Sequence, residues 1–320
     1  MGETVTLYSQ LRRMETPRPD GHFASFGSIV RWVLALLLCA ALGPGPSPAQ
    51  DPGRAVLAQF RAASALAVDP TGRLYVADAG RDVVRVLSAD GDTLATLGGT
   101  GTRAGEFDGP LDLDPTNGQT LYVADAGNGR LQQFSAEWQY LGAIPVGEGS
   151  EEAERVFDDG RDGADTQGAG RPVAVAASDS DETFVVDERA RAVVAFTPQG
   201  RRERLLGPAS RLDDPVDLAL GDDRRLYVAD RGREAVLAYD RFGTFLERLP
   251  TGALPGLRAV SVHRGRLWIV CADRVVVWSP GTEQVRRHRV SLGAPLVGAL
   301  PRDGHVVLLT QHRLLRRASW

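Results

Sequence analysis

The sequence predicts an all-β fold, a six-bladed β-propeller of four-stranded antiparallel blades in which the N-terminal strand closes the ring. Three observations support this prediction. One short segment recurs along the chain, strand patterns alternate with turn residues, and no stretch shows convincing helical periodicity. The composition, with 43% hydrophobic and 24% charged residues, is that of a folded protein with a large core.

The recurring segment is Leu-Tyr-Val-Ala-Asp, found at residues 74–78, 121–125 and 226–230. Looser copies begin at residues 183, 267 and 306, and most spacings between copies are about forty residues. That period is typical of propeller blades rather than of helical solenoids. The copies therefore predict six blades.

Each copy is the second strand of a four-stranded meander. In the first blade the expected strands are residues 65–68, 74–77, 83–87 and 93–97. The first turn is Asp69-Pro70-Thr71-Gly72, because proline and glycine suit the backbone angles of a turn. Asp90-Gly91 is a hairpin signal before the last strand. The later repeats follow the same plan.

The sixth repeat has room for only three strands before Trp320. Residues 56–60 precede the first complete blade and have no partner there. We expect this N-terminal strand to complete the sixth blade, because closure leaves no long exposed sheet edge. Residues 50–320 would then form a single propeller domain.

Charge and composition exclude some functions. The formal net charge is -4 at pH 7, so the chain lacks the basic surface that binds nucleic acid. The sequence contains no lysine, which excludes a catalytic Schiff-base lysine.

Residues 1–49 are expected to be a signal peptide and leader. An apolar run at 29–42 has the length of a signal sequence and is short for a membrane-spanning helix of ~20 residues. Small residues before Gln50 favour cleavage there, so we expect export to the periplasm or the extracellular space, with no membrane span in the mature protein. Lipoprotein anchoring through Cys39 is disfavoured, because the bulky Leu38 precedes it.

The aspartates that end the repeated strand are Asp78, Asp125, Asp187 and Asp230. Four carboxylates around a ring suggest a metal site. However, an aspartate at a tight turn accepts hydrogen bonds from nearby backbone amides, and residues that repeat with the blade usually build the blade. We therefore assign them a structural role at the turn.

Positions that break the repeat are better site candidates, because a binding site is asymmetric. Asp112 and Asp217 occupy equivalent places in the innermost strands of blades 2 and 4, and Arg258 lies nearby in blade 5. We expect these side chains to line the central channel. They suit a cation such as calcium, a polar ligand, or hydrogen bonds between blades. No other cofactor is expected.

The combination of repeat motifs is specific. It comprises the Tyr-Val-Ala-Asp core, the preceding Asp-Pro-x-Gly turn, residues 128–134 and the glycine-rich linker 98–107. In these motifs the chain resembles the NHL-repeat family of six-bladed propellers. The last two blades depart from the pattern, since Cys271 and Thr310 replace the repeat aspartate.

The resemblance implies that the linkers between blades and the turns after the repeat aspartates share one face. An acidic insert, residues 147–170, would lie there. Our candidate binding residues on this face are Arg81, Arg189, Arg231, Arg233, Glu151, Glu152, Asp158 and Asp159. Arginine gives planar bidentate contacts to polar groups. Our first hypothesis is a non-enzymatic, monomeric, exported binding or scaffold propeller, whose loops bind a protein, peptide or glycan of the cell envelope.

The alternative hypothesis is a metal-dependent hydrolase or lyase with its site in the channel. Similar propellers include amidating lyases, with zinc held by histidines, and lactonases, with calcium held by a Glu, Asn and Asp set. The chain after the leader has only four histidines, which are His263, His288, His305 and His312. A site like that of streptogramin lyases would need a channel histidine, and the sequence alone does not place one.

Overall fold

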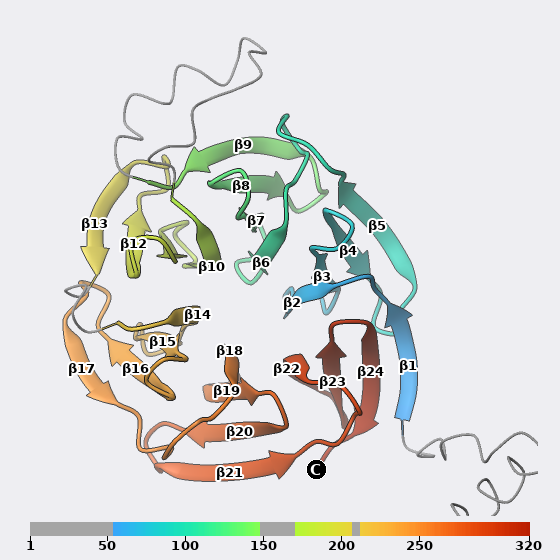
Figure 1. Ribbon diagram of the computed structural model, residues 1–320, viewed down its shortest axis with the longest axis vertical. Helices are drawn as coiled ribbons and strands as arrows, with labels where there is room; N and C mark the ends of the chain where they lie inside the picture. The colour runs from blue at the N-terminus through green and yellow to red at the C-terminus, as the bar shows by residue number, and fades with distance from the viewer. Residues whose placement is uncertain (1–53, 148–169, 207–211) are drawn as a thin grey trace, which may run out of the picture. The chain divides into compact units, whose positions relative to one another are not determined.

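The described part of the chain forms six four-stranded antiparallel sheets around a central channel, which confirms the predicted six-bladed propeller (Figure 1). The computed structural model describes residues 54–147, 170–206 and 212–320. Within these ranges every regular element is a strand, and no helix has the length and hydropathy needed to cross a membrane.

Blades 1 to 3 each use four consecutive strands. Blade 1 comprises β2 (Ala63–Val68), β3 (Leu74–Asp78), β4 (Val83–Leu87) and β5 (Thr93–Gly98). Blade 2 comprises β6 (Pro110–Asp114), β7 (Thr120–Asp125), β8 (Arg130–Ser135) and β9 (Tyr140–Pro145). Blade 3 comprises β10 (Pro172–Ala177), β11 (Thr183–Asp187), β12 (Ala192–Phe196) and β13 (Arg202–Leu206).

Blades 4 and 5 follow the same order, and blade 6 differs. Blade 4 comprises β14 (Pro215–Leu220), β15 (Leu226–Asp230), β16 (Ala235–Tyr239) and β17 (Phe245–Arg248). Blade 5 comprises β18 (Leu257–His263), β19 (Arg266–Cys271), β20 (Arg274–Ser279) and β21 (Gln284–Arg289). Blade 6 comprises β22 (Leu296–Arg302), β23 (His305–Thr310), β24 (Arg313–Ala318) and β1 (Arg54–Gln59).

The hydrophobic core lies between neighbouring blades. Leu74 and Val76 of β3 pack with residues of blade 6, such as Val307. Tyr75 and Ala77 point the other way and pack against blade 2. Because side chains alternate along a strand, the repeated segment buries one side chain after another on both of its faces. Blade packing thus explains why this segment is the best preserved part of the repeat.

A β-bulge interrupts each innermost strand shortly after its start. The pairing of β6 with β7 shifts between Pro110 and Asp112, and that of β14 with β15 shifts between Pro215 and Asp217. The other four innermost strands shift at the same place. Bulges bend a strand and redirect its side chains. The residue after each bulge therefore has an equivalent position in every blade.

The repeat aspartate ties a blade to the linker in front of it. Asp78 accepts hydrogen bonds from the amides of Arg61 and Ala62, at 3.1 and 2.8 Å. Asp125, Asp187 and Asp230 accept bonds from the amides of Asp108, Arg171 and Asp213, at 2.8, 2.9 and 2.8 Å. These amides precede the innermost strand of the same blade, 16 or 17 residues upstream. The aspartates thus hold the linker as well as the turn.

The hydrogen bonds also set the charge state of the aspartate. Burial alone would raise the pKa of Asp78. The amides of Ala62 and Arg61 and the guanidinium of Arg81 outweigh burial, so its pKa is lowered overall. The carboxylate is therefore ionised near neutral pH, and its hydrogen bonds are charge-assisted.

The outer strand of blade 6 comes from the N-terminal side of the propeller. β1 pairs antiparallel with β24, from Gln59 opposite Arg313 to Arg54 opposite Arg317. The next residue, Phe60, is 6% exposed and packs in the core between blades 6 and 1. The two ends of the described propeller thus share one sheet.

We expect deletion of residues 1–60 to destabilise the propeller, because it removes the β1 pairing and the buried Phe60 side chain. Burial of one such side chain contributes roughly 1.5–3 kcal/mol, which corresponds to a loss of about 3–10 °C in Tm. Circular dichroism melting measures this change. Deletion of residues 1–50 is the control and should leave Tm unchanged. Equal melting of the two truncated proteins would contradict a closing role for β1.

Candidate active site

A cavity of about 760 Å³ follows the channel between the innermost strands. Most of its lining comes from the innermost strands β2, β6, β10, β14, β18 and β22, which Figure 1 places nearest the centre of the ring. Its wall combines small and apolar side chains with many polar and charged ones, so the surface that faces the open space is at least as polar as it is apolar. A concave space with convergent polar groups is a candidate small-molecule site.

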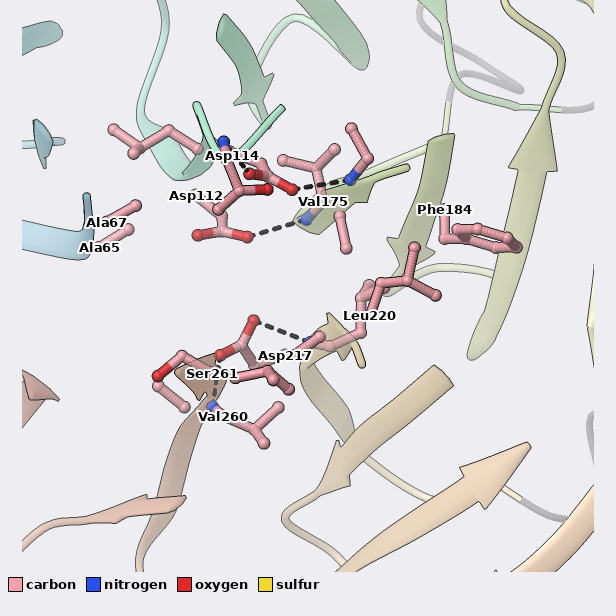
Figure 2. A pocket seen from close by; sticks show the side chains of 18 of the residues that line it. Ala65, Ala67, Asp112, Asp114, Val175, Phe184, Asp217, Leu220, Val260 and Ser261 are labelled. Carbon is pink, nitrogen blue, oxygen red and sulfur yellow. Dashed lines mark hydrogen bonds between the residues drawn. The ribbon is translucent and has the colours of Figure 1, made fainter. Parts of the chain in front are cut away.

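Asp112 and Asp217 lie at the position that follows the bulge. They pair with Ala124 and Ala229, at the same register in blades 2 and 4. The equivalent residues of the other blades are Ala65, Ala174, Ala259 and Gly298. Figure 2 shows the two carboxyl groups facing the same open space from opposite sides. The structure thus brings together the two aspartates selected from the sequence.

Each channel aspartate is held by backbone amides. Asp112 accepts a hydrogen bond from the amide of Val175 in blade 3, at 2.8 Å. Asp217 accepts bonds from the amides of Leu218 and Val260, at 2.8 and 2.7 Å, and Val260 belongs to blade 5. These bonds fix the carboxyl groups and also join neighbouring blades. Both uses anticipated from the sequence, blade bonding and a polar site, are compatible with this geometry.

A third carboxyl group, that of Asp114, was not among the sequence candidates. It lies two residues after Asp112 on the same side of β6, and Figure 2 shows it beside Asp112. Its oxygens accept hydrogen bonds from the amides of Thr116 and Ala177, both at 2.7 Å. The simple alternation of a strand predicts its direction once Asp112 is placed in the channel.

The carboxyl groups of the channel resist ionisation. Burial raises the pKa of Asp112 to about 7, and the nearby charge of Asp114 acts in the same direction. Burial and the charge of Asp112 raise the pKa of Asp217 well above its ordinary value. Burial also raises the pKa of Asp114. Because like charges in one cavity do not ionise together readily, the cluster keeps protons at neutral pH.

Basic and polar groups lie near the two ends of the cavity. Arg258 is exposed and occupies the bulge at the start of β18, so it is not equivalent to Asp112 and Asp217. Arg224 and Arg241 line the cavity near the ends of β14 and β16, on the side where the innermost hairpins turn. Arg241 forms an ion pair with Glu182 of the neighbouring blade, at 3.7 Å.

The sequence alone did not place a histidine in the channel, but in the structure His263 lies there. It is the last residue of β18 and lines the cavity. Ser261, two residues earlier, also lines the cavity, and its Oγ lies 3.1 Å from His263 Nε2. The sequence contains the necessary signal. Ala259, Ser261 and His263 alternate from the position equivalent to Asp217, so all three face the same way.

The channel carboxylates do not fit a calcium or zinc site. Calcium takes six or more oxygen ligands, and zinc takes three or four protein ligands. The oxygens of Asp112 and Asp217 instead accept amide hydrogens, whose positive ends repel a cation. Among the described residues, no three His, Cys, Asp or Glu side chains are grouped to hold a metal. We therefore derive no step that passes through a metal.

The candidate binding face has a different character from the one we expected. Arg81 pairs with Asp78 at 2.8 Å, Arg231 with Asp214 at 2.7 Å and Arg233 with Asp230 at 3.4 Å. Arg189 is exposed, and its backbone amide donates to Asp187 at 3.0 Å. Much of the arginine charge on this face is thus paired within the propeller. Glu151, Glu152, Asp158 and Asp159 lie outside the described residues.

The fold and the channel define a class, a six-bladed propeller with a polar small-molecule cavity on its axis. Solved structures similar to this chain include a streptogramin B lyase, with a TM-score of 0.58, 10% identity and coverage of 82% of this chain and 96% of that one. A catalytically inactive histidine-to-alanine variant of virginiamycin B lyase from Staphylococcus aureus, solved with quinupristin, has a TM-score of 0.58, 9% identity and coverage of 83% and 99%. A gluconolactonase from Xanthomonas campestris has a TM-score of 0.59, 16% identity and coverage of 83% and 89%.

No protein-family model matches the sequence, and no curated protein matches it. The structural neighbours are enzymes, so the first hypothesis, a non-enzymatic binding or scaffold propeller, is wrong, and the enzyme alternative is better supported. The physical reason for the error lies in the channel. Sequence reasoning gave weight to surface arginines that pair within the propeller, and it placed Asp112, Asp217 and Arg258 in the channel but not Asp114, Ser261 or His263.

We expect the purified protein to retain no stoichiometric calcium or zinc after dialysis. The channel carboxylates already accept hydrogen bonds from backbone amides, whose positive ends repel a cation. Plasma mass spectrometry of wild-type protein and of the D112A/D217A double variant measures bound metal per chain. A metal that is present at one per chain in the wild type and lost in the double variant would refute this reading of the site.

Proposed function

We propose that the chain is an enzyme of the lyase or lactonase type, with its site in the central channel. One observation carries this proposal. Asp112 and Asp217 face the same cavity and have raised pKa values, so an ionised and a protonated carboxyl group can coexist there near neutral pH. Solved structures with this fold include a streptogramin B lyase and a gluconolactonase, so elimination and lactone hydrolysis are the reaction types to test.

The two carboxyl groups suit general acid–base catalysis. Asp112, with a pKa of about 7, is the group that accepts a proton, from a carbon acid in an elimination or from water in a lactone hydrolysis. The pKa of Asp217 is also raised well above its ordinary value, so in this proposal Asp217 carries a proton and donates it to the leaving oxygen. Both groups are oriented by amides of neighbouring blades. Because these amides are fixed in the sheets, the acid and the base are preorganised.

The cavity limits the substrate to a small or medium-sized molecule. Its volume of about 760 Å³ lies within the ordinary range for small-molecule pockets. Its alanine, valine and leucine side chains contact the apolar part of a substrate, and its many polar groups select an oxygen-rich molecule. A lactone or another cyclic ester has both features.

We expect Asp112→Asn and Asp217→Asn each to lower kcat/KM by roughly 10²–10⁴, the usual contribution of a general acid or base. The test is ring opening of gluconolactone and of quinupristin, followed by mass spectrometry. Hydrolysis adds the mass of one water to the product, whereas elimination leaves the mass unchanged. Asp90→Asn, at an exposed outer turn, is the matched control. Full activity in both channel variants would refute the proposed site.

The rate should depend on pH in a direction set by the same groups. Asp112 must be ionised to act as the base, so kcat/KM should rise as pH increases through about 7. Asp217 must keep its proton to act as the acid, so kcat/KM should fall again at higher pH. Asp112 raises the pKa of Asp217, and the charge of Asp114 raises the pKa values of both groups. A rate independent of pH between 5 and 9 would contradict an acid–base pair with an apparent pKa of roughly 7.

We also propose that the repeats are of the NHL type and that the protein is exported as a monomer. The Tyr-Val-Ala-Asp motifs support the first statement, and the apolar run at 29–42 supports the second. N-terminal sequencing of protein from the periplasm or culture medium should begin near Gln50. Full-length protein confined to the cytoplasm would contradict export.

A further inference from the structure

Ser261 and His263 form a hydrogen-bonded pair inside the cavity. The two residues are alternate members of β18, so their side chains leave the strand on the same side. Ser261 Oγ and His263 Nε2 are 3.1 Å apart. A hydroxyl group within hydrogen-bond distance of an imidazole nitrogen is the core arrangement of an activated nucleophile.

The other serines that line the cavity have different partners. Ser64 Oγ lies 2.8 Å from the carbonyl oxygen of Pro110 and 3.3 Å from that of Ala77, so its hydrogen is held by the backbone. Ser178 Oγ lies 3.0 Å from Ser180 Oγ. Among the serines of the described cavity, Ser261 is thus the one whose Oγ lies within hydrogen-bond distance of an imidazole nitrogen. Ser64 provides a matched control.

His263 is neutral in this environment. Burial lowers its pKa to about 4, so one ring nitrogen keeps a lone pair at neutral pH. With the ring proton on Nδ1, Nε2 accepts the hydrogen of the Ser261 hydroxyl. Neutral imidazole in this tautomer is the form that a base needs.

The local backbone holds the pair in place. A two-residue hairpin joins β18 to β19, with Arg264 and Gly265 at φ 50° and 68°, and His263 pairs with Arg266 across it. Positive φ at both central residues is typical of a type I′ turn. On the other side of Ser261, the amide of Val260 donates to Asp217 at 2.7 Å. Figure 2 shows Ser261 beside Asp217, both at the open space.

We propose that Ser261 is a nucleophile and that His263 is its base in acyl transfer from an ester or lactone. This inference rests on the proposed function and deepens its hydrolytic form. Ser261 Oγ forms a bond with the carbonyl carbon, and its proton moves to His263 Nε2. The carbon–oxygen bond to the leaving group breaks, and the leaving oxygen takes the proton of Asp217. The products of this half are an acyl-serine, an imidazolium and the Asp217 carboxylate.

The second half restores the serine. Water forms a bond with the acyl carbon and gives one proton to Asp112. The bond between this carbon and Ser261 Oγ breaks, and the serine oxygen recovers its proton from the His263 imidazolium. The acid product leaves with the oxygen of water. One proton then passes from Asp112 to Asp217, either directly or through solvent, which resets the pair. No oxidant, reductant or metal is required.

A fluorophosphonate tests the first half without any knowledge of the natural substrate. The reagent forms an Oγ–phosphorus bond, fluoride leaves, and the hydroxyl proton goes to His263. We expect wild-type protein to gain one phosphonyl group, and peptide mapping should place it on Ser261. S261A should not be labelled, and H263A should be labelled at least about 10²-fold more slowly. Added imidazole should partly restore the rate in H263A, which a merely structural role would not do.

Two controls complete the experiment. S64A and D90N should be labelled at the wild-type rate, because Ser64 Oγ is held by backbone carbonyl oxygens and Asp90 lies at an exposed outer turn. Melting curves show whether each variant is folded, and the mapping of the wild-type label needs no variant. Absence of label on Ser261 in the folded wild-type protein, or equal labelling of S261A, would overturn the inference.

The outcomes also separate this inference from the proposed function. If lactone hydrolysis depends on Asp112 and the fluorophosphonate does not label Ser261, the serine mechanism alone is overturned. Labelling of Ser261 in a protein that opens neither gluconolactone nor quinupristin overturns the acid–base proposal and leaves a reactive serine. p-Nitrophenyl acetate provides a further readout, since an acyl-serine gives an initial burst of nitrophenolate.

Discussion

The propeller depends on a repeated contact between a buried carboxylate and the backbone amides of a linker. In blades 1 to 4 the repeat aspartate holds the residues just before the innermost strand. Hydrogen bonds to a charged group contribute roughly 1.5–3 kcal/mol each, so the start of each of these strands is fixed. A strand that starts at a fixed place, with a bulge two residues later, delivers the same position to the channel in every blade.

Two aspartates break this regularity and make the site asymmetric. Equivalent positions around the channel are mostly alanine or glycine, which leaves space along the axis, and only blades 2 and 4 have aspartate. Each aspartate reaches the backbone of the next blade, which orients it and also removes it from bulk water. Burial then raises the pKa values of both groups. The amides that join the blades thus orient the two carboxyl groups, and burial outweighs the lowering effect of these hydrogen bonds on their pKa values.

Much of the fold could be predicted from sequence, because a period of about forty residues and local turn chemistry carry the architecture. The channel positions of Asp112 and Asp217 followed from comparison between blades. Two things were beyond that reasoning. The partners of the repeat aspartates lie 16 or 17 residues away, and Arg231 pairs with an aspartate 17 residues upstream. No histidine was placed in the channel from sequence, whereas the alternation from Ala259 decides the direction of the His263 side chain.

The later blades show how a repeat can give up a structural role and gain a chemical one. In blade 5, Cys271 replaces the repeat aspartate, and the turn keeps the backbone bond from Ala272 to Gly256, at 2.9 Å, which has counterparts in blades 3 and 4. The inner hairpin of this blade has a tight two-residue turn in place of the longer Asp-Pro-x-Gly type. The strand therefore runs one residue further than β14, to His263 at the end of the channel, and Ser261, at the position equivalent to Ala219, lies beside Asp217. Loss of the motif in blade 5 thus goes together with the change that carries polar groups into the cavity.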